Sequence, residues 1–272
     1  MTSKSPQNGQ LEAILSVIDQ TQGNSDQFAE TLRHKHIPHL SFSQVSTVEF
    51  CHYRYFLQYE KLVDPTPVPD YFTNGKLLHQ VIATSYLNVA NERPIDPDQY
   101  FQLIRQHYQG VSETHLRNAI SVHLDNLWQN CEVVAVEEPF VMQIDERLPP
   151  MVGVIDLILK QDGKIILIDH KTGHDFYPQD ELQMAIYVEY ARQHFGGNNF
   201  TFYYEHYRWV KNLKRIRKPA FQRTEVILPA NYWRMAVRRI QSGFRVIEAI
   251  KTTQQAKKEG ECFRCPYRNI CW

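Results

Sequence analysis

The chain has 272 residues, of which 43% are hydrophobic and 22% charged, an ordinary globular composition with enough length to bury a core without disulfide support. Lys+Arg and Asp+Glu both number 30, so the formal net charge is zero and excludes a basic field over the whole molecule; contact with nucleic acid would need a local basic patch. The sequence has neither an apolar run of membrane-helix length nor the apolar segment of a secretory signal, so we expect a cytoplasmic protein without membrane contact.

Helical spacing of apolar side chains dominates the first half of the chain. The segments that show it are 11–20, 41–60, 75–90 and 97–130. Ser41 or Ser43 is expected to cap the second of these helices. The pattern predicts a tail with one short helix over residues 1–37 and a single domain over 38–272, in which residues 80–130 form a helical insertion.

The pattern becomes strand-like at residue 131. Strands are expected at 131–144, 151–160, 164–171, 199–210 and 221–228. Gln161-Asp162-Gly163 predicts a hairpin between the second and third strands. Helices are expected at 180–195 and 230–250, followed by a cysteine-rich cap at 261–272. The sequence therefore predicts an α/β core with a helical insertion and a cysteine cap.

Three charged side chains fall on the two strands of the predicted hairpin. Alternation places Asp156 on one face of its strand with Val154 and Ile158, and an acid in an apolar strand is costly to bury unless it is paired or binds a metal. Asp169 and Lys171 leave the next strand from one face. Two carboxylates suit Mg²⁺ or Mn²⁺, and a lysine can orient a water molecule during phosphodiester hydrolysis. The alternative is a salt bridge between Lys171 and either aspartate.

Two further features lie near this hairpin in sequence order. Gln183 and Tyr187 are one helical turn apart and share a helix face. His79 follows a loop at the beginning of a predicted helix. One histidine among 12 indicates little by itself, since most such residues are structural.

The order of these residues resembles the motifs of the RecB-like branch of the PD-(D/E)XK nuclease superfamily. The matching motifs are Gly75-xxx-His79, Asp156, Asp169-His170-Lys171-Thr172-Gly173 and Gln183-xxx-Tyr187. The resemblance implies a restriction-endonuclease-like core, in which a mixed central sheet is flanked by helices. It implies a metal site made of His79, Asp156, Asp169 and the backbone carbonyl of His170. It also implies that Lys171 is the catalytic lysine and that Gln183 and Tyr187 position the lysine, the water or the DNA strand.

Three cysteines near the end of the sequence, Cys262-x2-Cys265-x5-Cys271, have the spacing of thiolate ligands and need a fourth. The resemblance implies Cys51, because the segment from Cys51 to Phe56 is similar to the C-P-x-x-F segment of iron–sulfur nucleases, with His52 replacing proline. Four thiolates suit zinc and also a 4Fe–4S cluster, which this layout favours as a structural link between residues 51 and 262. A disulfide or free thiols remain alternatives, and Cys131 is expected to be a small buried hydrophobe.

A basic stretch at 207–223 is able to follow a phosphate backbone, and tyrosines beside it are able to stack on bases. The residues expected to contact nucleic acid are Tyr53, Arg54, Tyr207, Arg208, Lys211, Lys214, Arg215 and Arg217. The alternative is a solvated basic hairpin whose aromatic residues belong to the core.

Together these features predict a metal-dependent DNA exonuclease that acts in DNA processing, DNA repair or CRISPR adaptation. The chain resembles the CRISPR-associated RecB-like adaptation nucleases and the exonuclease V type, which implies a DNA substrate with single-stranded or frayed ends and a helicase or CRISPR adaptation partner. One alternative is a non-catalytic, iron–sulfur-stabilised DNA-binding subunit of a larger nuclease or recombination complex. Another is an iron–sulfur electron carrier, which leaves the acid–lysine grouping unexplained.

Overall fold

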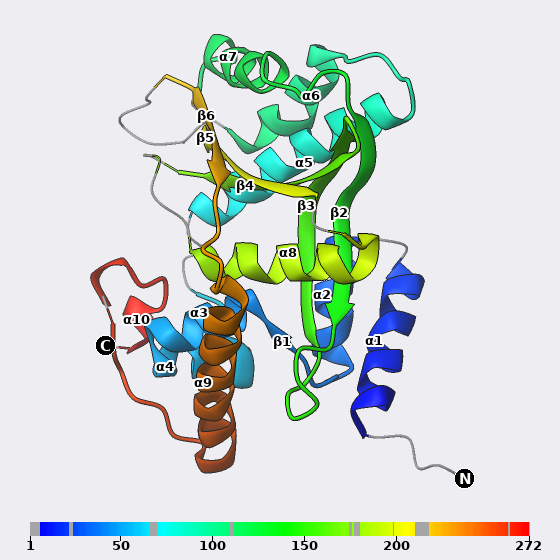
Figure 1. Ribbon diagram of the computed structural model, residues 1–272. Coiled ribbons are helices and arrows are strands. Elements are labelled where there is room, and N and C mark those ends of the chain that lie inside the picture. The colour runs from blue at the N-terminus through cyan, green and yellow to red at the C-terminus, as the bar shows by residue number, and fades with distance from the viewer. Residues whose placement is uncertain are drawn as a thin grey trace.

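The strands form one mixed sheet in the computed structural model (Figure 1). They are β1 (Leu40–Ser41), β2 (Glu132–Met142), β3 (Met151–Gln161), β4 (Lys164–Thr172), β5 (Phe200–Arg208) and β6 (Ala220–Val226). β1 pairs with β3 and β4 pairs with β5 in parallel, whereas β2–β3, β3–β4 and β5–β6 are antiparallel. The structure describes residues 6–21, 24–65, 70–108, 111–173, 176, 180–197, 199–209, 218–260 and 262–271.

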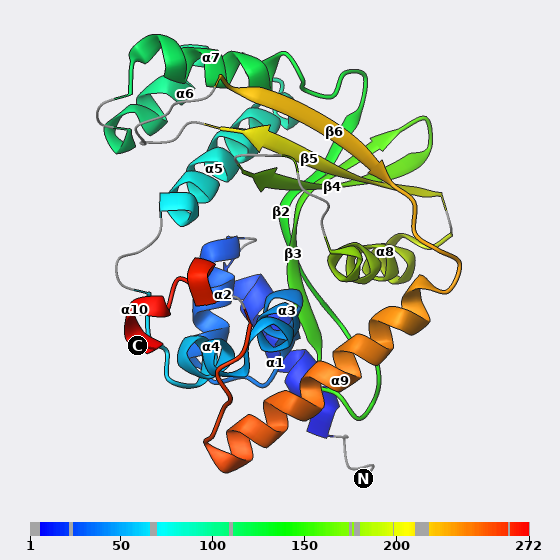
Figure 2. The same ribbon diagram turned by 90° about the vertical axis from the view of Figure 1, so that its left-hand side faces the viewer.

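Helices cover both faces of this sheet. They are α1 (Pro6–Thr21), α2 (Ser25–His34), α3 (Phe42–Phe50), α4 (His52–Tyr55), α5 (Asp70–Ala90), α6 (Pro97–Ile104), α7 (Glu113–Leu124), α8 (Glu181–Phe195), α9 (Tyr232–Thr253) and α10 (Arg268–Cys271). One hydrophobic cluster joins the sheet to α5, α6 and α7, and another joins it to α3, α8 and α9 (Figure 2). None of the described helices is long and apolar enough to cross a membrane. The mixed sheet between helical layers confirms the predicted restriction-endonuclease-like fold.

Local sequence signals explain where several elements begin and end. Asp162 and Gly163 have φ of 52° and 72°, the left-handed conformations that a tight hairpin turn requires, so the predicted β3–β4 hairpin is confirmed. Of the two predicted caps, Ser41 and Ser43, it is Ser41 that caps α3, through a capping box with Gln44. Asp180 caps α8, and Gly196 ends it with φ of 71°.

The pairing of β3 leaves a gap on one of its edges. β2 pairs along the other edge, while β1 pairs only with Met151 and Val152 and β4 begins to pair at Leu157. The backbone between these two pairings therefore has no strand partner on that edge, and Asp156 lies at its end.

The strict alternation expected around Asp156 is interrupted. Ile155 and Ile158 both pack in the cluster with α8 and α9, whereas Leu157 packs in the cluster with α5. Val154 packs instead against a third cluster, under α1 and α2. The inward face of β3 thus changes at Asp156, a bend that a two-residue period cannot indicate.

The N-terminal segment is more extensive than the predicted tail with one short helix. Both α1 and α2 are ordered elements, and α1 buries Ile14 and Val17 while α2 buries Phe28 and Leu32 against Val152 of β3. In the predicted helical insertion, the segment expected to be helical at 97–130 forms α6, a 3₁₀ turn and α7. Ser112 supplies a new N-cap for α7 within it.

Gly153 gives a test of the packing on β3. A Cβ at this position would lie 2.5 Å from Cε1 and 2.6 Å from Cζ of the buried Phe140 ring. Gly153→Val should lower the free energy of unfolding by about 1–3 kcal/mol, because the ring must move to admit the side chain. Urea unfolding followed by circular dichroism measures this. Gly9→Ala, at a helical glycine with nothing within 4 Å, is the control and should be neutral or stabilising.

Candidate active site

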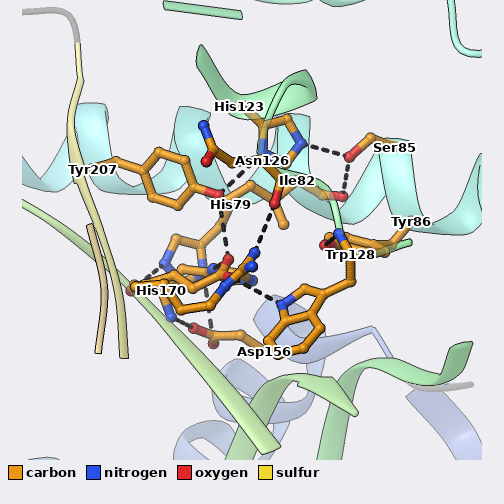
Figure 3. Close-up of polar contacts among 12 residues, drawn as sticks. His79, Ile82, Ser85, Tyr86, His123, Asn126, Trp128, Asp156, His170 and Tyr207 are labelled. Atoms are coloured by element: carbon orange, nitrogen blue, oxygen red, sulfur yellow. Dashed lines mark hydrogen bonds and ion pairs between the residues drawn. The ribbon is translucent and has the colours of Figure 1, made fainter. Parts of the chain in front are cut away.

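Four elements bring the predicted site residues together beside the gap on β3. The residues are His79 from α5, Asp156 from β3, Asp169 and Lys171 from β4, and Gln183 and Tyr187 from α8. Figure 3 shows the His79 ring facing both Asp156 and His170. Residues 79 and 187, far apart in sequence, thus contribute to one site.

His79 faces both strands of the hairpin. Its Nε2 lies 3.2 Å from the carbonyl oxygen of His170, and its Nδ1 lies 3.6 Å from Oδ1 of Asp156 (Figure 3). The neighbouring Leu78 and Ile82 are buried in the cluster beneath α5, so packing fixes the helix face that presents the imidazole. His79, which indicates little by itself in the sequence, is therefore held by packing in contact with Asp156 and His170.

Asp156 replaces a strand partner where β3 and β4 diverge. Pairing between the two strands stops at Leu157 and Ile168, and Oδ2 of Asp156 accepts the backbone N–H of His170 at 2.7 Å. The other carboxylate oxygen faces His79. One carboxyl group therefore holds the backbone of β4 and also contributes charge to the site.

Lys171 is held in a chain of polar contacts on the side of α8. Its Nζ lies 2.7 Å from Oδ2 of Asp169 and donates to Oε1 of Gln183 at 2.9 Å. Gln183 donates to Oδ1 of Asp169 at 2.6 Å and to the hydroxyl of Tyr187 at 2.9 Å, and this hydroxyl donates to the carbonyl oxygen of Val154 at 2.7 Å. The salt bridge offered as an alternative for Lys171 is thus present, and it forms part of the same grouping as Gln183 and Tyr187.

Burial and mutual repulsion shape the charges of the site. Burial raises the pKa of Asp156 to about 6; His79 opposes this rise and Asp169 adds to it. Burial lowers the pKa of His79, but Asp156 and Glu137 outweigh that effect and the pKa rises to about 9. Carboxylates gathered in a largely buried site favour a cation among them, and their oxygens with an imidazole nitrogen are ligands that Mg²⁺ or Mn²⁺ accepts.

Glu137 belongs to this group and was not predicted. Its Oε1 lies 3.5 Å from Nδ1 of His79, and one ligand atom from each of Glu137, His79 and Asp156 lies within 4.8 Å of the others. Glu137 and Glu138 are adjacent acids inside an apolar strand, the same signal that singled out Asp156. That signal indicates the pair, but it does not separate Glu137 from Glu138.

A buried polar network lies behind His170. Glu205 of β5 is 1% exposed, accepts Nε1–H of Trp128 at 2.9 Å and Nε–H of Arg223 at 2.7 Å, and places Oε2 3.2 Å from Nδ1 of His170. Arg223 also donates to the carbonyl oxygen of Asn126 at 2.7 Å. The network connects β4, β5 and β6 to the segment after α7, so it holds the strand that carries the site.

Tyr207 belongs to this network and not to a nucleic-acid surface. Its hydroxyl lies 3.2 Å from Nδ1 of His123 and donates to Glu205 at 3.3 Å, and the residue is only 2% exposed. A ring buried in this way cannot stack on a base, so the prediction for Tyr207 is wrong. The alternative interpretation, a core aromatic residue, holds for this tyrosine.

The other residues expected to contact nucleic acid are only partly described. Arg208 lies over the ring of Phe176, with 5.5 Å from Cζ to the ring centroid. Tyr53 and Arg54 line a cavity with the cysteines. The remaining four, Lys211, Lys214, Arg215 and Arg217, lie outside the described residues.

Four of the cysteines meet where α10 lies beside α4 (Figures 1 and 2). Cys51, Cys262, Cys265 and Cys271 are free thiols that line one cavity. Sγ of Cys51 accepts the backbone N–H of Arg54 at 3.4 Å. Burial raises the pKa of the Cys271 thiol, and Cys265 adds to this rise, so thiolates crowded here would require a cation.

The fold and this acid–lysine site define a nuclease. The family model of the PD-(D/E)XK nuclease superfamily matches residues 39–272, so the chain belongs to this superfamily. The match begins after α1 and α2.

Two solved structures are similar to this chain to different degrees. A candidate exonuclease from Eubacterium rectale is 11% identical, with a TM-score of 0.53 over 87% of each chain, which supports the fold. A structure called SSO0001 is 15% identical and covers 89% of this chain and 92% of its own, but its TM-score of 0.35 is too low to carry an argument. No curated protein matches the sequence.

The buried network predicts a pH-dependent stability. Burial raises the pKa of Glu205, but contacts with His170 and Arg223 outweigh it and hold the pKa below its ordinary value of 4.5. The stabilisation is therefore present above about pH 4.5 and is lost as the pH falls through the folded-state pKa. Arg223→Ala should lower the free energy of unfolding by about 3–5 kcal/mol at neutral pH, because Glu205 stays buried with fewer donors.

Urea unfolding of both proteins from neutral to acidic pH measures this difference, which should shrink once Glu205 is protonated. Arg117→Ala, which removes an exposed ion pair with Asp98 and Glu113, is the control and should change little at any pH. A pH-independent loss in Arg223→Ala would contradict the role assigned to the Glu205 charge.

Proposed function

We propose that this protein is a divalent-metal-dependent DNA exonuclease that prefers single-stranded or frayed ends. The observation that carries the proposal is the meeting of His79 with Asp156 and the His170 carbonyl, beside the Asp169–Lys171 pair of the same strand. The substrate preference is supported by the resemblance of the motifs to RecB-like nucleases. That resemblance also implies a helicase or CRISPR adaptation partner and 5′ polarity.

The metal ligands in this proposal are His79, Asp156, Asp169 and the carbonyl oxygen of His170. Their fit to Mg²⁺ or Mn²⁺ is supported by the buried, mutually repelling carboxylates and by their oxygen-rich donor set. When bound, the ion supplies polarisation of the phosphate and a water molecule of lowered pKa.

Lys171, Gln183 and Tyr187 position the reacting groups and offset their charge. Lys171 orients the attacking water and offsets charge that develops on the phosphate. Gln183 holds the Lys171 ammonium and Asp169 carboxylate at a fixed separation. Tyr187 links Gln183 to the backbone of β3 through Val154, so α8 keeps the lysine aligned with the two strands.

The cysteine site is proposed to hold a 4Fe–4S cluster, with zinc as the less favoured occupant. Support comes from the meeting of Cys51 with Cys262, Cys265 and Cys271 around one cavity. Backbone N–H groups directed at a cysteine sulfur, as at Cys51, stabilise thiolate ligands. The cluster would have a structural role in joining α4 to α10.

Lys171→Ala tests the nuclease proposal. The variant should lose about 10²–10³-fold in cleavage rate and still bind DNA, because it removes charge stabilisation and leaves the metal ligands in place. End-labelled single-stranded, double-stranded and circular DNA are incubated with Mn²⁺, Mg²⁺ or EDTA, using anaerobically purified protein.

Lys160→Ala is the matched control, since Lys160 lies on β3 in an exposed ion pair with Glu132. Metal-dependent loss of linear single strands by the wild type and this control, but not by Lys171→Ala, supports an exonuclease. Cleavage of circles would add endonuclease activity. Undiminished cleavage by Lys171→Ala refutes its role, and binding without any cleavage by the wild type favours a non-catalytic DNA-binding subunit.

Cys262→Ala tests the cysteine site. Wild-type protein purified without oxygen should be brown and contain iron, and Cys262→Ala should lose both iron and thermal stability, because it removes one of four ligands. Iron content, visible absorption and the melting temperature are measured. Cys131→Ala is the control, since Cys131 lies near the carbonyl of Trp128 and away from the cavity. A colourless, zinc-containing wild type would point to zinc.

A further inference from the structure

Glu137 has an unusual backbone conformation in the middle of a strand. Its φ is 54°, in the left-handed region that a residue with a side chain seldom adopts. The neighbouring positions are regular, since Val136 pairs with Leu157 and Glu138 pairs with Ile155. Glu137 therefore stands opposite Asp156, at the level where β3 changes its inward face. Strained residues of this kind persist where the surrounding structure holds them, often at functional sites.

The conformation directs the Glu137 carboxylate to one nitrogen of His79. Oε1 lies 3.5 Å from Nδ1, and the side chain is 24% exposed. The other nitrogen, Nε2, lies 3.2 Å from the carbonyl oxygen of His170, one of the proposed metal ligands. Nδ1 thus faces the Glu137 carboxylate and, at 3.6 Å, Oδ1 of Asp156, whereas Nε2 faces the carbonyl oxygen of His170.

A neutral imidazole can donate a hydrogen bond from the nitrogen that carries the proton and bind a metal through the lone pair of the other nitrogen. A carboxylate at Nδ1 holds the proton there and leaves the Nε2 lone pair for the metal. Asp156 is less suited to this task, because its Oδ2 already accepts the N–H of His170 and the carboxylate is itself a proposed ligand. Contacts of this kind are commonly long in an unliganded site and tighten on binding.

We propose that Glu137 is a positioning residue for the divalent metal ion: it accepts Nδ1–H of His79 and fixes the tautomer and ring orientation in which Nε2 binds the ion. The inference rests on the proposed function, since it takes His79 as a metal ligand. Loss of a hydrogen-bond partner of this kind typically weakens metal binding or activity about 10–100-fold.

The test measures Mn²⁺ binding without DNA, from the electron paramagnetic resonance signal of the free ion. Glu137→Ala should raise the dissociation constant about 10–100-fold, and Glu137→Gln should raise it less, because the amide keeps an accepting oxygen. Glu138→Ala, at the adjacent acid of the same strand, is the matched control and should leave it unchanged. Nuclease activity of Glu137→Ala should recover at saturating Mn²⁺.

A double-mutant cycle separates positioning from direct ligation. If Glu137 acts through His79, then Glu137→Ala should have no further effect in a His79→Ala background. Additional weakening there would overturn the inference and make Glu137 a ligand or a general structural residue. If Glu137→Ala does not fold, the same cycle is made with Glu137→Gln, whose shift must likewise vanish in the His79→Ala background.

The proposed metal site and the proposed role of Glu137 are contradicted by different results. If wild type and His79→Ala bind Mn²⁺ equally, or if neither binds it, the proposed metal site fails and the inference fails with it. If His79→Ala weakens binding but Glu137→Ala does not, the metal site stands and only the inference is overturned.

Discussion

The hydrogen bond from the His170 backbone to Asp156 is the constraint on which the site depends. β3 and β4 pair regularly up to Leu157 and Ile168, and beyond that level a side chain takes the place of the neighbouring strand. This contact keeps the strands joined at their divergence and directs the His170 carbonyl toward His79. Because the charged groups gather at a break in the sheet, they are close together without a strand backbone between them.

The divergence is stabilised differently on its two sides. On the side of α8, the Lys171–Gln183–Tyr187 chain ties the end of β4 to the backbone of β3. On the side of α5, Glu205 and its donors fill a buried position behind His170. Such a buried polar network destabilises the fold when a hydrogen-bond partner is missing, and it makes the core rigid when every group is paired. Polar contacts therefore fix the positions of the site residues, which hydrophobic packing alone would leave undetermined.

The sequence was sufficient to predict the β3–β4 hairpin and to place Asp169 and Lys171 on one face of β4, because a turn and a two-residue period act over short distances. It was also sufficient to bring His79 and Gln183 to the site through motif order. It was not sufficient for Glu205, whose partners come from distant segments, nor for Tyr207, whose burial depends on the packing of α5 and α7. The bend at Glu137 is a backbone conformation that its residue type does not indicate.

The position of α10 beside α4 has a consequence for the order of assembly on the ribosome. About 210 residues separate Cys51 from Cys262, and at roughly 5–20 residues per second their synthesis takes on the order of 10–40 s. During that interval Cys51 is present without the three cysteines that complete its cavity. All strands of the sheet precede those cysteines in the chain, so the cavity that Cys51 shares with them is completed only after the strands have been synthesised.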